Sequence, residues 1–99
     1  MVKAIVLYGA PQDADAFEDH YANQHLPLVS KMPDVQRFEA GKVLGTADGQ
    51  PAPYYRVAEL WFDSPEAMQQ SMGSPEGQAT VADIPSFATG GATVLIAEA

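Results

Sequence analysis

The chain has 99 residues, of which 46% are hydrophobic and 18% charged, a balance typical of one small globular domain spanning residues 1–99. Its formal net charge is −8, from thirteen acidic and five basic residues, so it would repel nucleic acid and anionic membranes, and neither is expected as a partner. The chain has no cysteine, which excludes disulfides, thiolate nucleophiles and cysteine-bound metal sites.

Residues 2–9 predict a buried first strand, because they are apolar or β-branched and are followed by Ala10 and Pro11. The chain enters this strand without a signal-peptide pattern, and no apolar run reaches the length of a membrane span, so a cytoplasmic protein is expected. Acidic residues then favour a helix that begins near Asp15, with Glu18 at capping-box spacing.

The first helix is predicted to be amphipathic and broken. Helical periodicity places four residues on its inward face: Phe17, Tyr21, Gln24 and Leu28. Pro27 has no amide hydrogen and clashes with the carbonyl group four residues earlier, so we expect a kink or restart over residues 24–27.

The remaining elements follow from strand periodicity and helix caps. Residues 35–44 and 54–62 predict two strands joined by a polar loop over residues 45–53. Two Ser-Pro-Glu sequences, at 64–66 and 74–76, predict two short helices that end near residues 84–85, before a last strand over residues 92–98. This order predicts an α+β fold with an antiparallel sheet, the ferredoxin-like βαββαβ arrangement.

The strands are apolar on both sides, whereas a sheet with one face in water should alternate apolar and polar residues. In the first strand, Ala4 and Val6 lie on one face and Ile5 and Leu7 on the other. We therefore expect a homodimer in which the second copy covers the free face. The alternative is that the C-terminal segment or the loops of the same chain cover it.

Two histidines, His20 and His25, are the only side chains that ordinarily titrate near neutral pH. At about 100° per residue they lie about 140° apart around a helix, which predicts that they do not share a metal ion. His25, at the predicted break, can act as a general acid or base, or it can be a satisfied half-buried side chain that closes the kink. His20 is expected near the surface.

The chain is rich in aromatic residues, most of which are expected in the core and a few around a cavity for a flat organic ligand. Tyr55 and Trp61 are predicted to share a strand face and to shape this cavity. We take His25 as the candidate catalytic residue. The candidate substrate-binding residues are His20, Tyr21, Phe38, Tyr55 and Trp61. No phosphate loop, nucleophile elbow or metal-ligand pattern occurs, so no cofactor is expected.

The chain resembles the EthD family of the dimeric α+β barrel superfamily over nearly its whole length. The resemblance rests on six segments: Phe17-Glu18-Asp19-His20-Tyr21, His25-Leu26-Pro27-Leu28, Met32-Pro33-Asp34-Val35 leading to Phe38, Ala58-Glu59-Leu60-Trp61-Phe62, Ser74-Pro75-Glu76-Gly77 and Ala82-Asp83-Ile84. His25 matches the histidine of the family's His-x-Pro-Leu pattern, and Asp34 stands where the family usually has glycine.

This resemblance implies a dimeric α+β barrel, whose two sheets face each other, with a pocket between sheet and helices in each subunit. Relatives are described as oxidoreductases, lactone isomerases, cofactor-free monooxygenases, and decarboxylases or dehydratases of aromatic polyketides. The expected function is therefore a cofactor-free oxidoreductase, isomerase or lyase that acts on an aromatic or lactone-like metabolite, with His25 as its acid-base group. The alternatives are a non-catalytic module that binds such a metabolite and a structural partner protein with a filled core.

Overall fold

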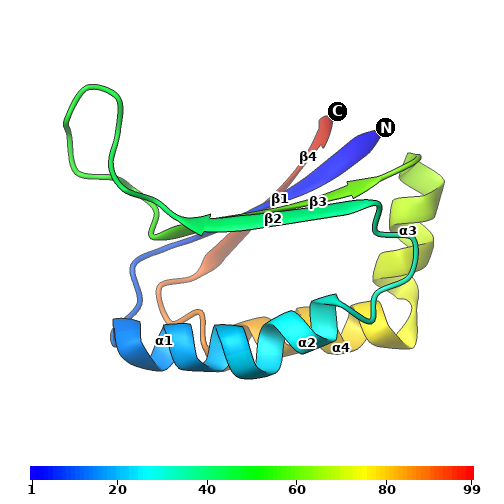
Figure 1. The fold of residues 1–99 in the computed structure, drawn as a ribbon, viewed down its shortest axis with the longest axis horizontal. Coiled ribbons are helices and arrows are strands. Elements are labelled where there is room, and N and C mark those ends of the chain that lie inside the picture. The colour runs from blue at the N-terminus through cyan, green and yellow to red at the C-terminus, as the bar shows by residue number, and fades with distance from the viewer.

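The computed structural model describes residues 1–99 as a four-stranded antiparallel sheet with helices packed on one side (Figure 1). In chain order the elements are β1 (Val2–Tyr8), α1 (Ala14–His20), η1 (Tyr21–His25), α2 (Leu26–Val29), β2 (Arg37–Lys42), β3 (Arg56–Phe62), α3 (Pro65–Gly73), α4 (Pro75–Asp83), η2 (Ile84–Ser86) and β4 (Ala92–Glu98). The strand order is β2-β3-β1-β4. This is the predicted ferredoxin-like βαββαβ fold.

The element boundaries follow the predicted caps, with one exception. Ser64 and Ser74 accept hydrogen bonds from the amide groups of Ala67, at 3.1 Å, and Gly77, at 3.0 Å, as expected for helix starts. The first helix, however, is capped by Asp13, which accepts from Ala16 N at 3.1 Å, and not by Asp15. Strands β2 and β3 are also shorter than predicted, although Gln36 and Val43, which flank β2, still donate backbone hydrogen bonds to Trp61 and Tyr55 at 2.8 Å.

The predicted helix break is a π-helical turn, η1, in which Leu26 N–H bonds to Tyr21 O, five residues earlier. In a regular α-helix, residues spaced four positions apart lie progressively further around the helix axis. The π-turn holds more residues per turn and offsets this rotation. The buried residues are consequently spaced by four throughout: Phe17, Tyr21, His25 and Val29. Gln24, predicted to face inward, is exposed for this reason, and His25 takes the buried place.

The core lies between the helices and one face of the sheet. β1 contributes Ala4, Val6 and Tyr8 to this face, and β3 contributes Ala58, Leu60 and Phe62, all buried. An aromatic cluster from the helical layer packs against them: Phe17, Tyr21 and Phe87. The core therefore places the π-turn directly over the strands.

The opposite face of the sheet is left uncovered by the chain itself. Helices α1, α2 and α4 lie on the other side, and the loop between β2 and β3 projects beyond the end of the sheet (Figure 1). Apolar side chains on the open face stay partly exposed, among them Ile5, Leu7, Val57 and Leu95. Coverage by the chain's own C-terminal segment or loops was the alternative, and it is wrong.

Two ion pairs lie on opposite faces of the sheet. Lys3 pairs with Glu59 at 3.0 Å on the open face, whereas Arg56 pairs with Glu18 of α1 on the helical face. No helix of the structure is both long and apolar enough to cross a membrane.

Asp34, in the turn that follows α2, has a φ of 63°, the left-handed region that favours glycine. Because the Asp34 side chain is exposed, we expect Asp34→Gly to change the free energy of unfolding by less than about 0.5 kcal/mol. We expect Asp34→Val to lower it by about 1–2 kcal/mol, since a β-branched residue tolerates this conformation poorly. Urea unfolding of the three proteins measures both changes. Equal stability of the Gly and Val variants would contradict the prediction.

Candidate functional site

An apolar cavity of about 130 Å³ lies between the sheet and the helical layer. Eleven of its thirteen lining residues are hydrophobic. Its floor is the helix-facing side of the sheet: Val6, Tyr8, Phe38, Ala58, Leu60 and Val94. Its roof comes from the helical layer and includes Tyr21, His25 and Thr80. Such a cavity suits a small organic molecule, with its few polar groups available to orient it.

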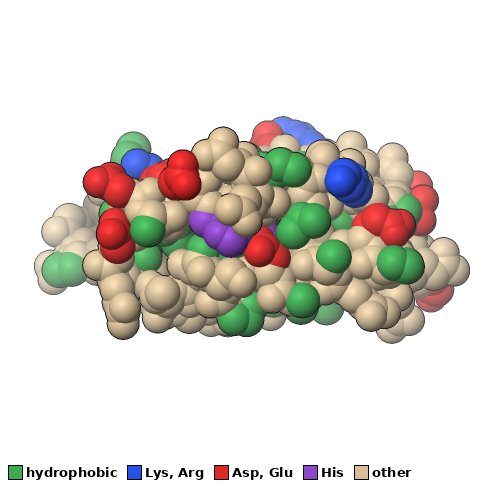
Figure 2. Space-filling view, turned by 90° about the horizontal axis from the view of Figure 1, so that it is seen from below, with side chains coloured by type: hydrophobic (Ala, Val, Ile, Leu, Met, Phe, Trp, Pro, Cys, Tyr) green, Lys and Arg blue, Asp and Glu red, His purple; other side chains and the backbone are tan.

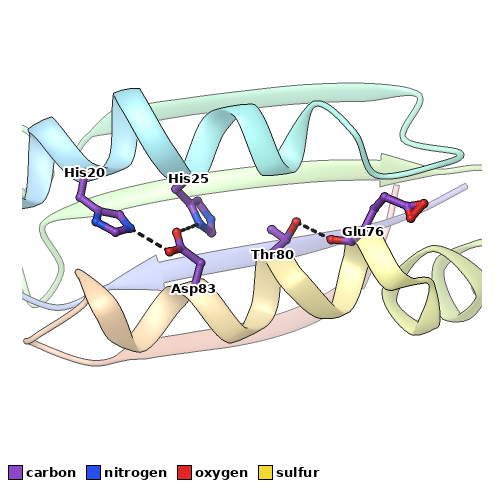
Figure 3. A network of polar contacts seen from close by, with 5 residues as sticks. All are labelled: His20, His25, Glu76, Thr80 and Asp83. Carbon is purple, nitrogen blue, oxygen red and sulfur yellow. Dashed lines mark hydrogen bonds and ion pairs between the residues drawn. The ribbon is translucent and has the colours of Figure 1, made fainter.

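His25, His20 and Asp83 form a hydrogen-bonded network at the edge of this cavity (Figure 3). One oxygen of Asp83, the last residue of α4, lies 2.9 Å from His25 Nδ1, and the other lies 2.8 Å from His20 Nε2. Side-chain exposure rises from 4% at His25 to 15% at Asp83 and 20% at His20. In Figure 2, which looks onto the helical layer, histidine atoms reach the surface next to an acidic side chain.

This network corrects the prediction that the two histidines lie on different sides of the helix. The value of about 140° assumed regular α-helical geometry. The π-turn between the two residues widens the helix and brings both rings to the side that faces α4. They share a carboxylate. No group of three or more His, Cys, Asp or Glu side chains is arranged to hold a metal ion.

The electrostatics fix the protonation states of His25 and Asp83. Burial lowers the pKa of His25 below its usual 6.5, although the hydrogen bond to Asp83 acts in the opposite direction. Burial alone would raise the pKa of Asp83, but the hydrogen bonds from His20 and His25 outweigh it, and the net pKa is lowered. At neutral pH His25 is therefore a neutral imidazole and Asp83 is a carboxylate.

His25 is consequently oriented as a base. A carboxylate can only accept hydrogen bonds, so His25 Nδ1 carries the hydrogen and donates it to Asp83. Nε2 then holds the lone pair, and it has no partner within the protein. The ring is held by Phe87, with centroids 4.7 Å apart, and stacks on Tyr21 at 5.5 Å.

Tyr21 supplies a second polar group beside His25. Its hydroxyl is buried and has no hydrogen-bond partner, which is costly unless a ligand fills that place. Burial raises its pKa to about 12, so the hydroxyl stays protonated and able to donate near neutral pH. The guanidinium group of Arg56 lies 4.6 Å from the centre of the Tyr21 ring and stabilises the ring through a cation–π contact.

The structure brings together only some of the residues proposed from the sequence. Tyr21, His25 and Phe38 line the cavity, and His20 binds Asp83 beside it. Trp61 lies on the open face of the sheet, with Lys3 and Arg37 stacked on its ring at 5.3 and 5.0 Å. It does not line the cavity.

Tyr55 also lies outside the cavity, and the prediction that it shares a strand face with Trp61 is wrong. It precedes the first residue of β3, so strand alternation does not govern its side chain. Its ring packs on Phe17 at 5.1 Å, and its hydroxyl donates to Glu18 at 2.9 Å, on the helical side.

Asp83, the partner of both histidines, belongs to one segment of the family resemblance, but sequence reasoning assigned it no role in the site. One signal was available, because an acidic residue in the last turn of a helix is opposed by the helix dipole. This unfavourable interaction with the helix dipole indicates that the carboxylate has a local role. Its pairing with residues 58 and 63 positions away could not be read from spacing.

Comparisons with known proteins bear on the family of this chain. A sequence model of the EthD domain matches residues 10–91. An uncharacterized 11.0 kDa protein in the thcB-thcC intergenic region of Rhodococcus erythropolis is 42% identical over 98 residues, which cover 99% of this chain and 94% of that protein.

Solved structures share the fold. An ethyl tert-butyl ether d (EthD) family protein from Bacillus halodurans C-125 superimposes with a TM-score of 0.93 at 36% identity, over 100% of this chain and 98% of that one. A dimeric ferredoxin-like protein of unknown function from Thermobifida fusca YX superimposes with a TM-score of 0.72 at 16% identity, over 96% of this chain and 87% of that one.

Proposed function

This chain belongs to the EthD family, and from that premise we propose that it is a homodimeric enzyme that moves a proton on a small aromatic or lactone-like carbonyl compound. The reaction class is an isomerisation or an elimination. One observation carries the proposal: a neutral histidine, oriented by a carboxylate, lines an otherwise apolar cavity. A base with a pKa near or below neutral is suited to accept a proton at physiological pH.

The residues divide the chemistry between them. His25 Nε2 accepts the proton from the carbon next to the substrate's carbonyl group, and Asp83 stabilises the imidazolium that forms. The Tyr21 hydroxyl donates a hydrogen bond to the carbonyl oxygen as negative charge develops on it. In an isomerisation the imidazolium returns the proton to another carbon, and in an elimination it protonates the leaving group. The apolar walls exclude water and strengthen each of these interactions.

The second part of the proposal is the dimer. The open face of the sheet carries apolar side chains from three neighbouring strands, and no element of the chain covers it. A second copy of the same face provides cover by two-fold symmetry. A ferredoxin-like neighbour in the comparisons is described as dimeric, which agrees with this assembly.

Exchange of carbon-bound hydrogen in D₂O tests the proposed reaction without a known substrate. We expect at least one member of a panel of aryl ketones and unsaturated lactones to lose its α-proton NMR signal faster with the protein than with buffer alone. Because burial lowers the pKa of His25, the rate should be constant near neutral pH and fall only below about pH 6.5. A rate that instead rises as the pH falls below 6.5 would contradict a neutral histidine base.

The same experiment separates catalysis from simple binding. A compound that perturbs the NMR signals of His25 and Tyr21 but keeps its proton over prolonged incubation would indicate the non-catalytic binding module. In that case the cavity and its aromatic walls keep their role, and His25 only orients the ligand.

A further inference from the structure

The inner cavity is too small to hold more than one ring. At about 130 Å³ it is comparable to a cavity of about 150 Å³ that accepts a single benzene molecule in another protein. Any larger substrate must therefore extend out of it. The direction in which the substrate extends determines which compounds the site can bind.

A second hollow adjoins the cavity at Met32 and Phe38, which line both. This groove, of about 410 Å³, lies along α2 and the turn that leads to β2. Its remaining apolar residues are Leu26, Val29 and Val35, and Ser30, Gln36 and Arg37 provide its polar groups. Met32 is buried and Phe38 half-buried, so the two side chains form the partition between the ring-sized cavity and the open groove.

We propose that this groove binds an apolar side chain of the substrate while the ring occupies the inner cavity beside His25. This inference rests on the proposed function and adds the substrate class: a ring that carries an alkyl chain. The two hollows lie side by side, with Met32 and Phe38 lining both, so one ligand that passes these two side chains can occupy both. Five of the eight residues that line the groove are hydrophobic, and its one cationic side chain, Arg37, is paired with Glu39, so the groove favours an uncharged chain.

A competing exit lies at the opposite edge of the cavity. Val81 and Val94, which also line the cavity, are 51% and 50% exposed, so the wall is open between α4 and β4. None of the other hollows in the structure includes either residue, so a chain that left by this side would lie on the surface. The groove at Met32 and Phe38 buries more of the apolar surface of such a chain.

Binding of phenol and 4-butylphenol, measured by calorimetry, tests the groove. Phenol fills the inner cavity and can donate its hydroxyl hydrogen to His25 Nε2. Because each buried methylene contributes about fourfold in affinity, we expect 4-butylphenol to bind at least tenfold more tightly. Both probes should perturb the His25 ring signals in NMR spectra, and only 4-butylphenol should perturb the amide signals of Ser30 and Val35.

Two matched variants locate the alkyl chain. Val35→Asn makes the groove polar, and Val81→Asn makes the same change at the competing exit. We expect Val35→Asn to remove most of the gain from the butyl group and to leave phenol affinity unchanged, whereas Val81→Asn keeps the gain. The reverse pattern, or equal affinities of the two probes for the unmodified protein, would overturn the groove and leave the proposed function standing. Failure of phenol itself to perturb His25 would overturn the ligand site, and the groove with it.

Discussion

His25→Gln is expected to lower the rate of catalysed proton exchange by a factor of about 10²–10⁴, the contribution usual for a positioned general base. Glutamine keeps a polar group of similar length but cannot accept the proton at neutral pH. The rate is measured on the best compound of the D₂O panel, together with the affinity for phenol. Phenol affinity should fall much less than the rate, because the aromatic walls of the cavity are unchanged.

His20→Gln is the matched control, since it makes the same change in the other histidine. His20 binds Asp83 but does not line the cavity, so its loss frees one carboxylate oxygen and leaves the bond between Asp83 and His25 in place. We expect a loss of about tenfold, equivalent to one hydrogen bond. Circular dichroism and the midpoint of thermal unfolding show whether each variant is folded. A folded His25→Gln variant with the unmodified rate would remove His25 from the mechanism.

The fold could be predicted from the sequence because its signals are local. The serine caps before Pro65 and Pro75 and the alternation in the strands each act over a few residues. The start of β3 was predicted less well, because Tyr55 N–H bonds to Tyr8 O although the regular register pairs Tyr8 with Arg56, and strand alternation fails at this irregular pair. This is why Tyr55 was assigned to the wrong side of the sheet.

The site could be predicted only in part, because it depends on a π-turn and a long-range contact. Pro27 indicated a break but not its form, and the form decides that His25 and not Gln24 is buried. The wider turn also brings His20 and His25 to one carboxylate. Periodicity rules for regular α-helices do not predict that outcome. The position of Asp83 in the last turn of a helix, and its place in a segment of the family resemblance, were the available signals.

The proposed dimer gives the second large effect, through Leu95 of β4. Leu95 pairs with Ile5 of β1, and both side chains face the open side of the sheet. Leu95 is 48% exposed in the single chain. Because the dimer is two-fold symmetric, Leu95→Asp removes an apolar side chain from both copies. Burial of each such side chain contributes about 1.5–3 kcal/mol to the free energy of association. We therefore expect the dimer to weaken by a factor of about 10²–10⁴, and more if the new carboxylates are buried. Sedimentation equilibrium over a range of concentrations measures the dissociation constant.

Ile96→Asp provides the control, because it makes nearly the same change one residue further along the same strand. Ile96 pairs with Ala4 on the helix-facing side and is 70% exposed, so the carboxylate stays in water. We expect this variant to dimerise like the unmodified protein. If both variants remained dimeric, the interface would have to lie away from the open face. If both became monomeric, the edge of β4, and not the face of the sheet, would hold the two copies together.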